Sequence, residues 1–191
     1  FVDRARTLRR GDVGVLRVGA TPQTLERTLP RVLKRFSTLA PGVDVRLKEG
    51  HPAAISEWLL SGDLELGLIP FRPELREGCR RAGTIHLVVA GLPARARTRK
   101  TVDVAALDRV RVLVLSRGFG SRELFDAACE VAHVRPNIVL ESNAPGTLLS
   151  LARAGYGAAV LPTTITLPAG VAVQRVQQSG QLLTSDLAVH W

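Results

Sequence analysis

The sequence predicts an α/β protein made of two small lobes, each with a parallel β-sheet and helices packed against it. A strand–helix–strand–helix–strand order occurs over residues 13–69 and again over 111–162. Strand-like segments near 84–91 and 161–173 join the two repeats, so the chain would cross between the lobes twice. Alternating strands and helices are typical of parallel sheets with right-handed crossovers, and this pattern sets the fold class.

The elements of the first repeat follow from apolar periodicity and from proline. Apolar residues of VDVRLKEG alternate as in a half-buried strand, and Pro22 and Pro52 are of the residue type favoured at the first position of a helix. Pro30 lies inside the helical pattern and predicts a bend. The expected strands are 13–20, 43–50 and 64–69, and the expected helices are 22–39 and 52–61.

The second repeat is read in the same way, and two strands are expected after it. Its strands are 111–116, 137–142 and 158–162, and its helices are 121–134 and a segment that begins at Pro145 and ends at Gly155. Strand-like runs at 171–176 and 187–191 enclose the turn sequence QQSGQ. The polar, basic stretch 91–101 is expected to be a surface loop.

The composition excludes several classes of protein. Among 191 residues, 26 Lys and Arg against 17 Asp and Glu give a net charge of +9, but the arginines are scattered and only 4% of residues are aromatic. This favours a solvated basic surface over direct nucleic-acid contact by this chain. No apolar run approaches the roughly 18 residues of a membrane span, so no membrane partner is expected. Cys79 and Cys129 are too few for a disulfide framework and favour the cytoplasm, with a redox switch and two inert thiols left open.

The candidate ligand-binding residues lie on the turns that lead from a strand into a helix. Parallel sheets bind ligands at the carboxyl ends of their strands. A helix N-terminus also offers unpaired backbone N–H groups and a positive dipole end, which suit an anion. We therefore expect a small organic acid to bind in one cavity between the lobes. The candidate residues are Thr21, Gln23, His51, Phe119, Ser121, Arg122 and Asn143.

His51 stands at a helix cap position that Ser, Thr, Asp or Asn normally occupies. As a metal ligand it lacks neighbours, because His86, His133 and His190 are far away in the sequence and no Cys or carboxylate stands at metal-ligand spacing. As a catalytic base it lacks a nucleophile, since no G-x-S-x-G motif is present. The sequence leaves open a ligand contact or a turn residue that faces solvent. We expect no enzyme activity, no metal and no cofactor, because GYG at 155–157 precedes a strand and so is not a dinucleotide-binding loop.

An ordered set of segments resembles the effector-binding region of LysR-type transcriptional regulators. The segments are GVLRVGATPQTLERTLPRVLKRF (14–36), PGVDVRLKEG (41–50), LLSGDLELGLI (59–69), VLESNAPGTLLSLARAGYGAAVLP (139–162) and the closing DLAVHW. The resemblance implies two Rossmann-like subdomains in a type 2 periplasmic-binding-protein-like fold with two crossover strands. It also implies an effector cleft, a homodimer or tetramer, and contact with DNA only through a separate N-terminal helix-turn-helix domain.

The resemblance sets the expected domain boundaries. Residues 1–11 would be the tail of a linker helix, 12–86 with 165–191 the first subdomain, and 87–164 the second. The sequence departs from the family at Glu65 and Gly67, where Asp and Ala are usual, and the family usually continues into a helix packed on the first subdomain. The alternatives are a transporter's solute-binding protein with the same fold and an α/β enzyme. The absence of a catalytic motif from the sequence disfavours the enzyme.

Overall fold

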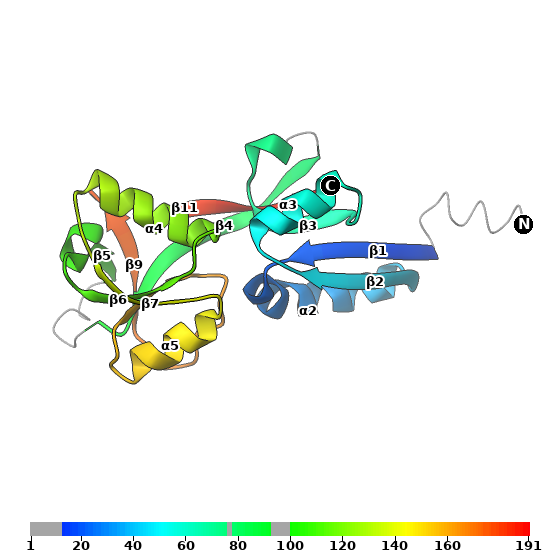
Figure 1. Ribbon diagram of the computed structural model, residues 1–191. Coiled ribbons are helices and arrows are strands. Elements are labelled where there is room, and N and C mark those ends of the chain that lie inside the picture. Colours follow the sequence, from blue (N-terminus) through cyan, green and yellow to red (C-terminus); the bar gives the residue numbers. More distant parts are fainter. Residues whose placement is uncertain (1–12, 76–77, 93–99) are drawn as a thin grey trace, which may run out of the picture. The chain divides into compact units, whose positions relative to one another are not determined.

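The computed structural model describes residues 13–75, 78–92 and 100–191, and they form two compact units (Figure 1). Unit 1 runs to Ala82 and includes Leu187–Trp191, and unit 2 is Gly83–Asp186. These boundaries differ from the expected ones, because 83–86 and 165–186 lie in unit 2 instead of the first subdomain. The reason is the pairing of strand Val173–Gln178 with two strands of unit 2.

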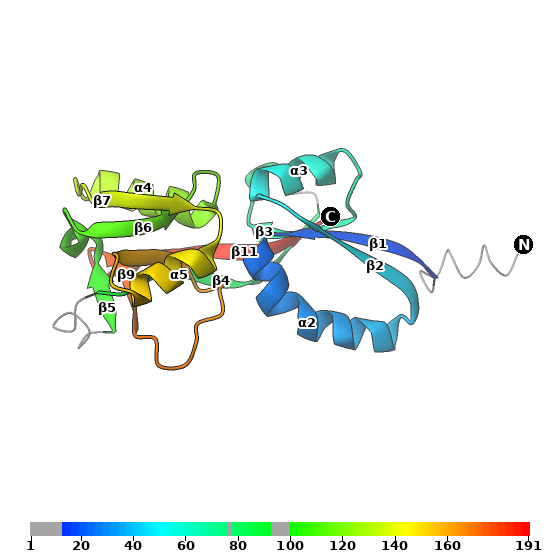
Figure 2. The same cartoon turned by 60° about the horizontal axis from the view of Figure 1, so that its bottom comes forward.

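Unit 1 is a sheet with one helix on each face. Its strand order is β2-β1-β3-β11, with β1 parallel to both neighbours and β11 antiparallel to β3. Helix α3 covers one face and α2 the other (Figure 2). The elements are β1 (Val13–Ala20), α2 (Pro22–Leu39), β2 (Gly42–Glu49), α3 (Pro52–Leu60), β3 (Leu66–Pro70), the 3-10 helix η1 (Pro73–Leu75) and the end of β11 (Thr184–His190).

Unit 2 repeats this plan with the strand order β4-β8-β6-β7, and α4 and α5 lie on opposite faces (Figure 2). Strand β6 is parallel to β7 and β8. Strand β9 pairs with β4, β5 and β10. The elements are β4 (Cys79–Ala90), β5 (Thr101–Asp103), η3 (Val104–Leu107), β6 (Arg111–Leu115), α4 (Gly120–Val131), β7 (Asn137–Ser142), α5 (Pro145–Arg153), β8 (Ala158–Pro162), β9 (Val173–Gln178) and β10 (Gln181–Leu182).

The expected helices and strands are confirmed within a few residues, and α2 runs as one helix through Pro30. The sequence missed the short elements η1, β5, η3 and β10; of these, β5 depends on pairing with the distant strand β9. The expected helix tail at 1–11 and the loop centre at 93–99 lie outside the described residues. Among the described residues, no helix is both long and apolar enough to cross a membrane.

The core of unit 2 is split by its sheet into two layers. Along β6, Val112 and Val114 pack on the α4 side, whereas Leu113 and Leu115 pack on the α5 side. This alternation follows from the two-residue period of a strand. Both faces are apolar, as expected for a parallel sheet covered by helices on both sides. The two layers fix α4 and α5, and with them the turns that precede these helices.

In unit 1, the buried side chain of Ile55 from α3 packs in an apolar cluster and lies close to three glycines. A Cβ built at Gly19, Gly50 or Gly67 would lie within 3.5 Å of an Ile55 carbon. These glycines come from β1, the end of β2 and β3, so the helix approaches three neighbouring strands closely. The approach holds the first turn of α3, and therefore His51, against the carboxyl ends of the strands.

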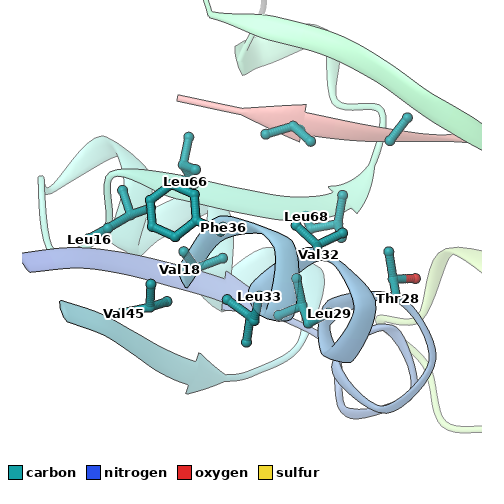
Figure 3. A pocket seen from close by; sticks show the side chains of 12 residues that line it. Leu16, Val18, Thr28, Leu29, Val32, Leu33, Phe36, Val45, Leu66 and Leu68 are labelled. Atoms are coloured by element: carbon teal, nitrogen blue, oxygen red, sulfur yellow. The ribbon is translucent and has the colours of Figure 1, made fainter. Parts of the chain in front are cut away.

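The opposite face of unit 1 has an apolar groove between α2 and the sheet, shown in Figure 3. Its volume is about 350 Å³, and Val32 on the helix is 52% exposed. Thr28 is its one polar lining residue; the others are Leu16, Val18, Leu29, Val32, Leu33, Phe36, Val45, Leu66, Leu68, Ala82 and Val189. None of the candidate ligand-binding residues lines it, so the groove is separate from the site that the sequence predicts.

Candidate functional site

Two strand-to-helix turns of unit 1 lie side by side. Ala20 at the end of β1 pairs with Glu49 at the end of β2, and the Gly50 N–H donates a hydrogen bond to the Ala20 carbonyl at 3.3 Å. The next residues, Thr21 and His51, have extended backbones and are the N-caps of α2 and α3. The expected placement of both residues at helix N-termini is confirmed.

Unit 2 has a matching pair of turns. Leu115 at the end of β6 pairs with Ser142 at the end of β7, and the Ser116 N–H donates to the Ser142 carbonyl at 3.2 Å. Phe119 is the N-cap of α4 and Ala144 is the N-cap of α5. Each unit therefore brings two helix N-termini to the same edge of its sheet.

The first turns of these four helices are left without side-chain caps. At Thr21, His51, Phe119 and Ala144, the N-cap side chain makes no capping hydrogen bond. By contrast, Asp103 caps η3 by accepting from the Ala105 N–H at 3.0 Å. First-turn N–H groups carry the positive end of the helix dipole, so uncapped turns are suited to bind an anion.

The candidate residues of unit 1 differ in exposure. Thr21 is 4% exposed, and its hydroxyl is hydrogen-bonded to that of Thr24 at 2.9 Å, which keeps it from capping the helix. Gln23 is 5% exposed, and its Oε1 has no hydrogen-bond partner among the described residues. His51 is exposed. The sequence did not single out Thr24, although its position in the first turn of α2 was available as a signal.

In unit 2, Ser121 is half-buried and Asn143 is exposed, so both are open to solvent at the turns. Phe119 is buried instead and packs in the α5-side core layer with Leu148. The apolar ring therefore contributes to this core layer, and the ligand contact expected of Phe119 stays a prediction.

Arg122 is 3% exposed, and its Nε and Nη1 bind partners within unit 2. Its Nε donates to both carboxylate oxygens of Asp126 at 2.8 and 2.9 Å, and its Nη1 lies 3.0 Å from both the Leu115 carbonyl and Glu141 Oε1. Burial alone would lower the pKa of Arg122, but the two carboxylates outweigh it and raise the pKa. The i,i+4 spacing could have revealed the Asp126 contact, whereas the Glu141 contact depends on strand pairing.

The two cysteines lie in different units, as the sequence indicated. Cys129 on α4 is buried, and burial with the nearby Asp126 carboxylate raises the pKa of its thiol to about 11. A thiol that stays protonated at neutral pH is a poor nucleophile, which favours an inert role for Cys129. Among the described residues, no three His, Cys, Asp or Glu side chains are grouped as a metal site. The shared cavity for all candidate residues stays a prediction.

Comparison with known proteins shows what this chain is similar to. The family model of the LysR substrate binding domain matches residues 9–191. The uncharacterized HTH-type transcriptional regulator YybE of Bacillus subtilis is 28% identical over 163 residues, which are 84% of this chain and 56% of that protein. The HTH-type transcriptional regulator CysB of Haemophilus influenzae is 24% identical over 155 residues, or 80% of this chain and 48% of CysB.

Among solved structures, CbnR, a LysR family transcriptional regulator, superposes with a TM-score of 0.72 at 25% identity. The superposition covers 98% of this chain and 66% of the CbnR chain. The Synechocystis PCC6803 CcmR regulatory domain superposes with a TM-score of 0.78 at 19% identity, covering 92% of this chain and 86% of its own. The chain spans about half the length of the curated relatives. These relatives are transcriptional regulators, which does not favour the alternative of a transporter's solute-binding protein.

Proposed function

The chain belongs to the LysR substrate binding domain family, the effector-binding part of these transcription regulators, and we propose that its uncapped strand-to-helix turns bind a small anionic effector. The absence of side-chain caps at Thr21, His51, Phe119 and Ala144 carries this proposal. Ser, Thr, Asp and Asn are the usual caps, so the four helices lack a side-chain partner for the first-turn N–H groups that a cap would bind. Three of these helices begin with proline, which has no N–H, so the donors come from the residues after it.

Each proposed contact has a defined role. The backbone N–H groups of the first turns receive the anionic group, and Thr21 and Ser121 offer hydroxyls beside them. His51 is exposed at the N-terminus of α3 and donates to an acceptor on the ligand. Asn143 offers an amide before α5, and Gln23 offers one in the first turn of α2. Charge-assisted hydrogen bonds to a carboxylate are among the strong ones, which favours an organic acid.

A thermal-shift screen tests this proposal. We expect C2–C4 carboxylates to raise the melting temperature, whereas uncharged amides of the same carbon skeletons do not. A ligand that binds only the folded protein stabilises it by mass action. The test variant is Ser121→Ala, which keeps the first helical turn but removes the hydroxyl, and it should weaken the response. Stabilisation by the neutral amides and not by the acids would contradict the proposal.

The rest of the regulator's behaviour follows from the family. We propose that effector binding controls DNA binding by a helix-turn-helix domain outside this chain. The regulator would act in the cytoplasm, where the bacterial DNA lies, and it would catalyse no reaction. The relatives YybE and CysB are HTH-type regulators, which supports this arrangement. The family resemblance implies a helix on the first subdomain, and the apolar groove beside α2 has the aliphatic lining that such a helix would bury.

We also propose a homodimer in which α2 of one copy lies along α4 of another. The exposed residues Arg31 and Arg35 on α2 and Glu123 and Glu130 on α4 have complementary charges. Opposite charges steer association and fix the orientation of partners more than they add affinity. Exposed ion pairs contribute only about 0–1 kcal/mol each, so the apolar contacts between copies would have to supply most of the affinity.

The charge pairing gives a prediction. Arg31→Glu should weaken a dimer measured by light scattering at low salt, and the added Glu130→Arg should restore it, because the pair is reversed. Arg153→Glu at the end of α5 has the same charge change on another face and should leave the dimer unchanged. A monomer at about 100 μM protein would count against the dimer.

A further inference from the structure

Arg122 occupies a position that is unfavourable for a cation in two respects. It is the third residue of α4, where the positive end of the helix dipole favours an anionic side chain. It is also 3% exposed, and removing a charge from water costs several kcal/mol unless the charge is paired. Residues that violate local rules in an otherwise consistent fold are concentrated at functional sites.

The contacts of Arg122 explain how the fold tolerates it. Its guanidinium joins the last residue of β6, through the Leu115 carbonyl, to Glu141 near the end of β7 and to Asp126 one turn along α4. These are the strands whose ends carry the turns to α4 and α5. Both carboxylates are partly exposed, at 44% for Glu141 and 40% for Asp126. Glu141 lies three residues before Ala144, the N-cap of α5.

We propose that Arg122 is a positioning residue that neutralises the Glu141 and Asp126 carboxylates, so that the two helix N-termini of unit 2 can accept an anionic effector. Without this cation, a carboxylate close to the ends of β6 and β7 would repel the ligand that the uncapped turns attract. The guanidinium also holds both turns in place through its three partners. The inference rests on the proposed function, because it assumes an anion at these turns.

The proposal differs from two simpler roles of the same side chain. If Arg122 were a direct ligand contact, its side chain would face solvent, but only 3% of it is exposed, and its Nε and Nη1 already bind three partners. If it were only a structural tie, removing Glu141 would loosen the turns and weaken binding. In our proposal, removal of Glu141 takes away a repelling charge and strengthens binding, so the two roles predict opposite signs.

The experiment compares Glu141→Gln, Arg122→Met and the double variant, with inorganic phosphate and C2–C4 carboxylates as probes. The measured quantity is the probe concentration that gives half of the maximal thermal stabilisation, at low and high salt. We expect Glu141→Gln to bind the anion about 3-fold more tightly and Arg122→Met about 10-fold more weakly. These effects are modest because both carboxylates are partly exposed, so that solvent and salt screen their charges. In the double variant, Glu141→Gln should recover most of the affinity that Arg122→Met alone loses. High salt should reduce all these differences in affinity.

Glu57→Gln is the matched control, because it removes the same charge from an exposed position on α3 of unit 1 and should leave the affinity of the unit 2 turns unchanged. Weaker anion binding by Glu141→Gln, or an Arg122→Met loss that neither the second substitution nor salt reduces, would overturn the inference while the proposed function stands. If Arg122→Met does not fold, the sign of the Glu141→Gln effect decides alone. If no anion stabilises the wild type, the proposed function fails and the inference fails with it.

Discussion

Replacing Phe125 by alanine is expected to lower the free energy of unfolding by about 3–5 kcal/mol. Phe125 is 1% exposed and lies in the core layer that α4 forms with β4, β6 and β8 of unit 2. Truncation removes a ring from a closely packed interior, and the surrounding strands can collapse only partly into the space. Urea unfolding followed by far-UV circular dichroism, which reports helices and strands of both units, measures this loss.

Val131→Ala is the matched control for Phe125→Ala. It shortens another apolar side chain of α4, but Val131 is 70% exposed, so the change should stay within about 0.5 kcal/mol. Because Phe125 also fixes the helix whose first turn contains Ser121 and Arg122, its loss should reduce stabilisation by anions at temperatures where the variant is still folded. A loss below about 1 kcal/mol would contradict the packing described for α4.

The elements of this fold were predictable where local rules act alone. Prolines 22, 52 and 145 marked three helix starts correctly, because proline fixes φ and needs no hydrogen-bond donor at the first helical position. The apolar run 158–162 was recognised as a buried strand, and all five of its residues are buried. By contrast, the sequence places residues 165–186 with the first subdomain, whereas they lie in unit 2 of the structure, since the pairing of β9 with β4 and β5 is not visible in either segment.

The placement of the candidate residues on strand-to-helix turns was predictable, but the state of each side chain was not. The rule that ligands bind at the carboxyl ends of parallel strands located the turns of Thr21, His51 and Asn143. It could not show that Arg122 is buried, because its partner Glu141 becomes a neighbour only when β7 pairs with β6. It also could not show that the Thr21 hydroxyl bonds to Thr24 instead of capping α2. Such facts depend on side-chain geometry that sequence spacing does not determine.

The close approach of α3 to its sheet leads to the second large effect. Ile55→Ala is expected to lower the free energy of unfolding by about 2–5 kcal/mol, because Ile55 has no exposed surface and fills the space above Gly19, Gly50 and Gly67. Trp58 packs against the same cluster, so tryptophan fluorescence during urea unfolding reports this region directly. The N-terminus of α3, with His51, should become less firmly held, and anion stabilisation should fall as well.

Gly67→Ala tests whether the glycines are needed for space. A Cβ there would lie 3.0 Å from Ile55 Cγ2 and 2.6 Å from Leu59 Cδ1, and Leu59 is only half-buried and can rotate away. We therefore expect Gly67→Ala alone to cost about 1–3 kcal/mol through overpacking against Ile55. In the Ile55→Ala background the colliding methyl is absent, and the new Cβ fills part of the cavity, so the same substitution should cost less than about 1 kcal/mol.

The double-mutant cycle of Ile55→Ala and Gly67→Ala should thus give a coupling of about 1 kcal/mol or more. Gly83→Ala is the matched control, because it is another strand glycine with nothing within 4 Å of its Cβ position, and its effect should add to that of Ile55→Ala. Additive effects of Gly67→Ala and Ile55→Ala would mean that the glycine is not there to admit the isoleucine. A coupling of the expected sign would show that the glycine at position 67 leaves the space that Ile55 fills.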